Sequence, residues 1–400
     1  QSRGLGDVYK RQILALACLV TGVCTLSRKW YVNLPVFLIC IAGETFMAYL
    51  FFPAYALWPA CGSVAIFAFS TAWEHLKPSG RKENKSPIRL PVISGVPYRH
   101  LEFYYYYSNF LVYGGAGSGK TKSIGKWLLE EYIRLGFAGF IYDFKDVDYT
   151  QTAYNLTKKY GYPHKFYYVS FDKPERSYRF NPLKVVKDRT ELMQLMEDVL
   201  LALLPKGEKQ NEWVAGGLGI LRGVAFRFWD EFPEYCTLPH IMAFIMTAST
   251  RQLSIFLQQN LVAEMMAGAY LKAEGSEKTQ ASYLSTLCNN LSTISQNEEI
   301  AYILSGDDFD FNLIDPEDPK LFAISNNFSK NSVYAPVIGM LMSISTRQFT
   351  MQNKVPFVYF LDEMTTVNIK NFETLPSVLR EYKVGFVLLT PVSYTHLTLP

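Results

Sequence analysis

The stretch LVYGGAGSGKTKSIGKW, residues 111–127, constrains the fold more than any other part of this sequence. It fits the pattern G-x-x-x-x-G-K-[ST], with Gly114, Gly119, Lys120 and Thr121 at the fixed positions. Such a loop cradles phosphate because its backbone N–H groups point inward and a helix N-terminus follows it. Apolar residues before the loop predict a strand, and those after it predict a helix. We therefore expect an α/β domain that binds a nucleotide.

Nine consecutive loop residues are predicted to bind this nucleotide. They are Gly114, Gly115, Ala116, Gly117, Ser118, Gly119, Lys120, Thr121 and Lys122. Lys120 would reach the β- and γ-phosphate oxygens of ATP as a point charge, and the Thr121 hydroxyl would be a ligand of Mg²⁺. The alternative interpretation is a glycine turn with an unrelated lysine, but such a turn would need neither the strand nor the helix.

An acidic pair far downstream of the loop supplies the second half of the site. The apolar run VPFVYFL, residues 355–361, ends in Asp362 and Glu363. Asp362 would hold Mg²⁺ through a water molecule, and Glu363 would orient and polarise the attacking water as a catalytic residue. Strands often end in Asp, so the acid pair alone is a weak indication of a nucleotide site. It becomes a strong one only together with the phosphate loop. Lys120 and Asp362 are expected to meet across neighbouring strand tips and to bind one magnesium–nucleotide complex.

The order of strand and helix signals predicts the fold class. Runs of β-branched and aromatic residues predict strands at residues 108–114, 136–144, 164–171, 320–325, 355–363 and 384–390. Between about residues 184 and 305 the apolar residues instead recur at helical spacing. Strands that alternate with helices indicate a parallel sheet covered on both faces, and the long helical stretch indicates an inserted all-α domain.

Most of the hydrophobic excess, within a chain that is 49% hydrophobic, lies before residue 75. Apolar segments at residues 13–26, 35–53 and 54–73 predict N-terminal transmembrane helices. Arg28 and Lys29 separate the first two segments, and six cations follow the third, so the positive-inside rule places both clusters in the cytoplasm. Glu44 would face another helix or a partner subunit rather than lipid. The alternative is a buried helical hairpin of a soluble domain.

The two ends of the chain and its remaining composition add few constraints. Residues 1–12 and 391–400 resemble translated sequencing-adapter read-through, and we expect that neither segment belongs to the native protein. Residues 1–12 carry +2 of the formal net charge of +3. The overall charge of the remaining residues therefore does not indicate that they bind a polyanion such as nucleic acid. The six cysteines and five histidines are scattered and predict neither a disulfide framework nor a metal site, which agrees with a reducing cytoplasm.

Together these features resemble the coupling proteins of type IV secretion systems, the VirD4/TraG/TraD family of conjugation. The resemblance covers nearly all of residues 13–390. Besides the loop, it rests on IYDFKDVD (141–148), SYRFNPL (177–183), SGDDFDFNLI (305–314), KLFAISNN (320–327) and FLDEMTTVNIKNFETLPSVLREYKVGFVLLT (360–390).

The resemblance implies a RecA-like P-loop NTPase with membrane helices before it and the all-α domain inserted into it. It further implies a homo-hexameric motor at the bacterial inner membrane, with the motor domain in the cytoplasm. This motor would use ATP and Mg²⁺ to deliver single-stranded DNA with its relaxase to the secretion channel. The expected divisions are 1–12, 13–74 (membrane), 75–107 (basic segment and first strand), 108–184 (nucleotide-binding), 185–305 (all-α), 306–390 (nucleotide-binding) and 391–400.

Three further expectations concern single residues. By resemblance Arg380 is an arginine finger that would reach the γ-phosphate of a neighbouring subunit, while the alternative is a surface cation on a helix C-terminal turn. Pro391 stands where the family usually has a sensor Gln, so the chain as written is expected not to hydrolyse ATP. Asp143 and Lys145 would contact the nucleotide or a neighbouring subunit, or would take part in a structural salt bridge.

Several functions remain open at this stage. Another membrane-tethered DNA pump, of the chromosome-segregation type, would share the loop and the acid pair, although the long helical insertion favours the coupling protein. An ABC transporter ATPase would need an LSGGQ-like signature, which the sequence lacks. A non-catalytic adaptor would use ATP only to fix the ring and would recruit secreted proteins. Trp213 and Trp229 are expected in the core of the helical domain rather than on a DNA surface.

Overall fold

The computed structural model divides the chain into two compact units, with the second beginning at Ser86. It describes residues 86–92, 100–115, 117–204, 211–369 and 372–391, and a few isolated helical positions between Leu38 and Cys61. The predicted membrane segments and the predicted foreign ends therefore lie almost wholly outside the described residues. Among the helices of these described ranges, none combines the length and the apolar character needed to cross a membrane.

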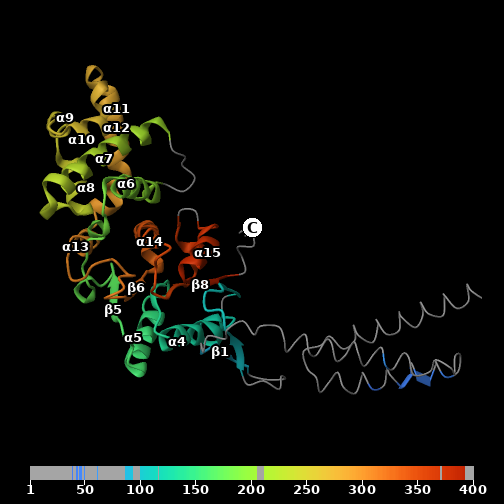
Figure 1. Cartoon of the computed structure of the whole chain (residues 1–400). Coiled ribbons are helices and arrows are strands. Elements are labelled where there is room, and N and C mark those ends of the chain that lie inside the picture. The colour runs from blue at the N-terminus through green and yellow to red at the C-terminus, as the bar shows by residue number, and fades with distance from the viewer. Residues whose placement is uncertain are drawn as a thin grey trace, which may run out of the picture. The chain divides into compact units, whose positions relative to one another are not determined.

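A six-stranded sheet forms the centre of the second unit (Figure 1). All of its strand pairs are parallel, and the order across the sheet is β3-β8-β7-β4-β6-β5. The strands are β3 (Phe110–Tyr113), β4 (Ala138–Asp143), β5 (Lys165–Ser170), β6 (Lys320–Ser325), β7 (Phe357–Leu361) and β8 (Val384–Thr390). This sheet confirms the predicted α/β fold with parallel strands.

Both faces of the sheet are buried, which explains why its central strands read as continuous apolar runs. Along β7, Val358 and Phe360 point into a core formed with helices α4 (Lys126–Arg134) and α5 (Asp148–Tyr160). The alternate residues, such as Tyr359, point into the opposite core with α14 (Asn331–Thr346). Figure 1 shows α4 and α5 on one side of the sheet and α14 on the other.

The α-helices that the structure describes between β5 and β6 form one group (Figure 1). Its members are α6 (Arg189–Leu203), α7 (Glu212–Glu231), α8 (Leu238–Thr247), α9 (Thr250–Gln258), α10 (Leu261–Met266), α11 (Gly268–Lys272), α12 (Glu277–Ser295) and α13 (Glu298–Leu304). The central helix α7 packs against α6, α10 and α12. At Gly219 it approaches α10 so closely that a Cβ atom would lie 2.7 Å from the Met266 carbonyl oxygen.

The helical group and the α14 face of the sheet share one continuous buried core. Arg347, at the end of α14, ties the two together: its Nε donates to the Asp198 carboxylate of α6 at 2.5 Å, and its Nη1 donates to Gln194 at 2.7 Å. Asp198 is buried, so this guanidinium replaces the water that the carboxylate would otherwise need. The helical insertion is therefore fastened to the sheet by both apolar packing and charge.

The segment before the phosphate loop differs from the sequence expectation. One strand was expected within residues 75–107, but the structure has an antiparallel pair, β1 (Ile88–Pro91) and β2 (His100–Phe103). The Glu131 carboxylate of α4 accepts a hydrogen bond from the Arg89 N–H at 2.7 Å, which fixes β1 against that helix. A hairpin separate from the main sheet could not be distinguished from a sheet strand by residue pattern alone.

Candidate nucleotide-binding site

The phosphate loop lies between the end of β3 and the helical turn that leads into α4. Gly117 and Gly119 have φ values of 75° and 84°, which side chains other than glycine rarely adopt. At Gly114 an added Cβ would collide with the side chains of Ser118 and Lys120. The backbone path therefore requires glycine at Gly117 and Gly119, and close packing favours it at Gly114, whereas nothing lies within 4 Å of a Cβ added at Gly115. Ala116 lies outside the described residues.

Lys120 bends back over the loop that precedes it. Its ammonium group donates to the carbonyl oxygens of Gly114 and, at 3.3 Å, of Gly115. The charge is thus held at the centre of the loop, where a phosphate group would replace the carbonyl oxygens as its partner. Lys122 is exposed, and no ion pair joins it to a carboxylate of the described residues, so its place in the nucleotide site stays a prediction.

Thr121 begins an irregular helix rather than an ordinary α-helix. Residues Thr121–Gly125 form a π-helical turn, η2, before α4 takes over. At Gly125 an added Cβ would lie 3.1 Å from the Tyr149 ring carbon Cζ, so a glycine is needed where α5 crosses this turn. Tyr149 in turn packs on Phe360 of β7, with ring centroids 4.9 Å apart. Single π-helical turns occur often at functional sites.

Asp362 follows β7 directly and is almost fully buried, with 1% of its surface exposed. Its backbone N–H donates to the Tyr142 carbonyl at 3.0 Å, but the side-chain oxygen Oδ2 has no hydrogen-bond partner among the described residues. Burial raises the pKa of Asp362 to about 7, while the cation Lys145 and, less strongly, Lys120 oppose this rise. A buried carboxylate with an unsatisfied oxygen suits a divalent cation, since the cation would supply the missing charge and ligation.

Glu363 is held in an unusual backbone conformation beside Asp362. Its φ is 46°, in the left-handed region, which costs a residue other than glycine roughly 1–2 kcal/mol. Thr366 stabilises this turn, because its N–H and its hydroxyl both donate to the Glu363 carbonyl, at 2.9 and 2.8 Å. The Thr366 hydroxyl also bonds the Tyr142 hydroxyl at 2.7 Å. The hydrogen bonds of Thr366 and Tyr142 therefore fix the backbone position from which the Glu363 side chain extends.

Strand order corrects one expectation about the two halves of the site. Lys120 and Asp362 were expected at neighbouring strand tips, but β8 lies between β3 and β7. Both halves still belong to one sheet and one carboxyl edge, and Lys120 is near enough to lower the pKa of Asp362. Thr390 ends the intervening strand, and its buried hydroxyl has no hydrogen-bond partner among the described residues. Sequence reasoning missed Thr390, because only the strand order reveals its position between the loop and the acids.

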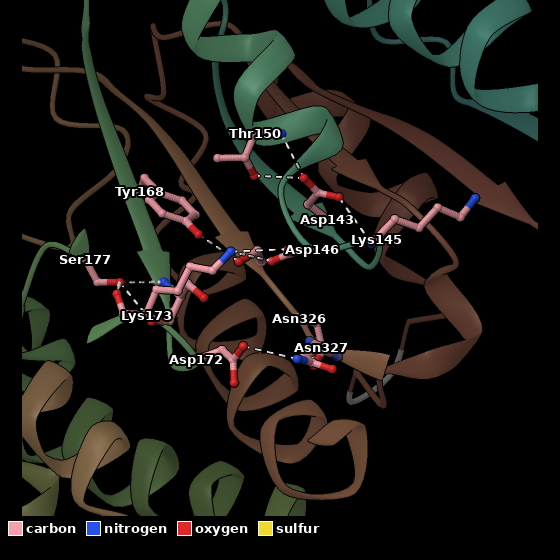
Figure 2. Close-up of polar contacts among 12 residues, drawn as sticks. Asp143, Lys145, Asp146, Thr150, Tyr168, Asp172, Lys173, Ser177, Asn326 and Asn327 are labelled. Atoms are coloured by element: carbon pink, nitrogen blue, oxygen red, sulfur yellow. Dashed lines mark hydrogen bonds and ion pairs between the residues drawn. The ribbon is translucent and has the colours of Figure 1, made fainter. Parts of the chain in front are cut away.

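Asp143 and Lys145, the two residues of the Asp-x-Lys motif, have different roles at the end of β4 (Figure 2). The buried Asp143 carboxylate accepts hydrogen bonds from the Thr150 N–H at 2.8 Å and its hydroxyl at 3.0 Å, which fixes the first turn of α5. Burial raises the pKa of Asp143 to about 6 despite these bonds. Lys145 forms a salt bridge, which was one of the alternatives for this motif, and its partner is Glu363, at 3.8 Å between Nζ and Oε1.

Further ion pairs connect the loops along this carboxyl edge. Lys173 pairs with Asp146 at 3.2 Å, and Asn327 donates to Asp172 at 3.1 Å (Figure 2). Lys330 also pairs with Asp172, at 2.5 Å. A hollow of about 430 Å³ lies in the same region and is lined by Phe144, Lys145, Asp146, Asn327, Phe328 and Glu363. Ligands of parallel α/β sheets bind outside the carboxyl ends of the strands, which is where this hollow lies.

Arg380 lies away from this edge. It is exposed on the short helix η9 (Leu379–Tyr382), immediately before β8 begins, and therefore near the opposite edge of the sheet. In its own chain Arg380 thus cannot contact a phosphate held by the loop. Of the two tryptophans expected in the helical core, Trp229 is half-buried and Trp213 is 40% exposed, with its ring 5.3 Å from that of Tyr283.

The comparison with protein families decides which class of phosphate-binding proteins this is. A family model described as type IV secretory system conjugative DNA transfer matches residues 77–390. The match includes the phosphate loop, the helical insertion and the acid pair. The chain belongs to this family. No curated protein sequence matches the chain significantly.

Solved structures of the coupling protein TrwB share the fold. The unbound bacterial conjugative coupling protein TrwBdeltaN70 matches with a TM-score of 0.57 and 17% identity, over 77% of this chain and 67% of the TrwBdeltaN70 chain. The plasmid coupling protein TrwB in complex with ADP and Mg²⁺ matches with a TM-score of 0.56 and 18% identity, over the same shares of the two chains. TrwB in complex with a non-hydrolysable ATP analogue matches with a TM-score of 0.56 and 17% identity, over 77% of this chain and 68% of that chain. At this identity the likeness establishes the TrwB-like NTPase fold.

Proposed function

We propose that this chain is part of a membrane-anchored ATPase that couples single-stranded DNA and its relaxase to a type IV secretion channel. The observation that carries the proposal is the meeting of a phosphate loop with a buried, unsatisfied Asp362 oxygen at one sheet edge, in a chain of the conjugative DNA-transfer family. A structural role alone would not explain that oxygen, because buried carboxylate oxygens normally have partners.

The chain's own residues have distinct roles in this proposal. Lys120 exchanges its loop carbonyls for the β- and γ-phosphate oxygens of ATP. Thr121 and Asp362 would hold Mg²⁺, which supplies positive charge against the phosphate oxygens. Glu363 accepts a proton from the water that attacks the γ-phosphate and orients that water in line. TrwB has been solved with ADP and Mg²⁺, which agrees with this ligand choice.

The position of Arg380 supports a role in trans. In a ring, the edge of one subunit that carries Arg380 would face the carboxyl edge of the next, and its guanidinium would stabilise the developing charge on the γ-phosphate. We therefore infer a homo-hexamer that is anchored by the apolar segments within residues 13–74. The divisions expected from sequence, with residues 185–305 as the all-α part, remain part of this proposal.

Nucleotide binding can be tested on the full 400-residue chain in detergent, using a fluorescent ATP analogue with Mg²⁺. Lys120→Ala should weaken binding by about tenfold or more, because it removes a charge-assisted contact. Lys354→Ala, which removes an exposed lysine before the start of β7, is the matched control and should bind as wild type does. Equal binding by both variants would contradict the assignment of the loop.

The DNA-pumping part of the proposal needs a hydrolysis test in a full-length relative that carries the same acid pair. Single-stranded DNA should stimulate its ATPase activity, and replacing the Glu matched to Glu363 by Gln should abolish hydrolysis while binding persists. An adaptor that uses ATP only to fix the ring would show no stimulation by DNA and would tolerate this replacement.

A further inference from the structure

β5 is an edge strand of the main sheet, and only part of its outer edge is covered. The segment after β5 turns and runs back beside it. The Tyr178 N–H donates to the Tyr168 carbonyl at 3.0 Å, and the Ser177 hydroxyl bonds both backbone groups of Ser170 at 2.8 Å. Figure 2 shows Ser177 beside this end of the strand. The carboxyl-terminal half of β5 is thus protected.

The returning segment leaves the strand before it reaches Phe166. The Arg179 N–H donates to the Asp308 carboxylate at 2.7 Å, and the Phe180 N–H donates to the Ile303 carbonyl at 2.8 Å. Backbone groups of alternate residues in a parallel strand face the same side, so those of Phe166 face outward like those of Tyr168. In the described part of the chain, no turn, loop or side chain hydrogen-bonds to the backbone of Phe166 on this side.

A hollow of about 690 Å³ opens at this uncovered stretch. One wall comes from α5, where the Tyr154 ring lies 6.0 Å from the Phe166 ring. The other wall comes from Tyr178, whose ring lies 5.1 Å from that of Tyr167. Tyr154 and Tyr178 are 46% and 44% exposed, so both rings are available to a ligand. We name this hollow, with its strand edge, the Phe166 groove.

One cation in the groove is left for a ligand. The Lys158 ammonium lies over the Tyr154 ring at 5.4 Å, and no carboxylate of the described residues pairs with it. Lys165, by contrast, pairs with Asp318 at 3.3 Å. The His164 Nε2–H donates to the Gly136 carbonyl at 3.0 Å, and burial lowers the pKa of His164, so it adds no charge at neutral pH. The groove therefore offers one unpaired cation, Lys158, beside the Tyr154 ring, while the Asp308 carboxylate that also lines the hollow accepts the Arg179 N–H.

We propose that the Phe166 groove binds a short extended segment of a partner protein, which adds to β5 as a further strand. An N–H donor and a C=O acceptor, side by side on a strand edge, are complemented by another extended peptide backbone. Nucleic acid carries no such alternating donors and acceptors along its backbone. Alternate side chains of the segment contact the Tyr154 wall and the Tyr178 wall, and one carboxylate pairs with Lys158. This inference does not depend on ATP hydrolysis.

The test begins with random 12-residue peptides displayed on phage and selected against the full chain in detergent. The most enriched peptide is synthesised with a fluorophore, and its backbone nitrogens are methylated one at a time. Methylation at positions that face β5 should weaken binding about tenfold, while methylation at the positions between them should have no effect. This period of two is the signature of strand addition, because only alternate N–H groups face the partner strand.

Variants of the protein locate the binding. Tyr154→Ala should weaken the peptide about tenfold, whereas Tyr160→Ala, on the same helix but outside the groove, should not. Wild type should bind the peptide that carries the carboxylate side chain more tightly than the same peptide with the corresponding amide, and Lys158→Glu should reverse this preference. This variant also keeps the test valid if Tyr154→Ala does not fold. Failure to enrich any peptide, methylation effects without the period of two, or binding unaffected by Tyr154 and Lys158 would overturn the proposal. So would labelled oligothymidine binding that requires Tyr154 in the absence of peptide binding.

Discussion

Lys145 and Glu363 form an ion pair, with Nζ and Oε1 3.8 Å apart, although they lie on separate segments of the chain. They meet because β4 and β7 are hydrogen-bonded neighbours whose carboxyl ends align, with Tyr142 opposite Leu361. Lys145 also opposes the rise in the pKa of Asp362 more strongly than Lys120 does. The Asp-x-Lys motif is therefore joined electrostatically to the acid pair.

Replacing Lys145 should have little effect on stability. Its side chain is 49% exposed and the pair is long, and exposed ion pairs contribute about 0–1 kcal/mol. Lys145→Met should therefore change the free energy of unfolding, measured by urea titration, by less than about 1 kcal/mol. A loss of several kcal/mol would show that Lys145 supports the fold rather than the acid pair.

Asp143 predicts a pH dependence of stability. Its pKa is raised to about 6 from the ordinary value of 3.8, so the ionised form is disfavoured in the folded chain, and stability falls as pH rises through this range. Asp143→Asn should be more stable than wild type at pH 8, by up to about 3 kcal/mol, and the advantage should vanish near pH 4. Thermal melting at several pH values measures this.

The exposed Asp310 provides the control for that series. Its carboxylate also accepts a backbone hydrogen bond, from the Asn312 N–H at 3.0 Å, but it lies in solvent. Asp310→Asn should show no comparable gain at pH 8. If Asp143→Asn gains nothing at pH 8 either, the Asp143 carboxylate is not destabilised by burial.

The contact of α7 with α10 predicts a packing effect. An added Cβ at Gly219 would lie 2.7 Å from the Met266 carbonyl, so Gly219→Ala should destabilise the helical group by about 1–3 kcal/mol. Gly268→Ala is the control, because nothing lies within 4 Å of its added Cβ. Chemical denaturation should separate the two variants; equal stabilities would mean that α7 and α10 are not packed this closely.

The sequence predicted individual strands better than their arrangement. Residues 320–325 and 384–390 were predicted as strands with the bounds that β6 and β8 have, because each is a short apolar run with clear ends. The order of strands depends on packing between distant segments, so the place of β8 between β3 and β7 was not predictable. For the same reason the unsatisfied Thr390 hydroxyl and the Lys145–Glu363 pair had no signal in the sequence. The left-handed conformation of Glu363 was also hidden, because Thr366 and Tyr142 stabilise it.

The central claim is that the loop and the acid pair bind one magnesium–nucleotide complex, and a double-mutant cycle tests it most directly. Binding of the fluorescent ATP analogue with Mg²⁺ is measured for the full chain, for Lys120→Ala, for Asp362→Asn and for the double variant. The account predicts that the two changes are not additive, with an interaction energy of about 1 kcal/mol or more. Effects that add to within about 0.3 kcal/mol would contradict it, because Lys120 and Asp362 would then act on separate ligands.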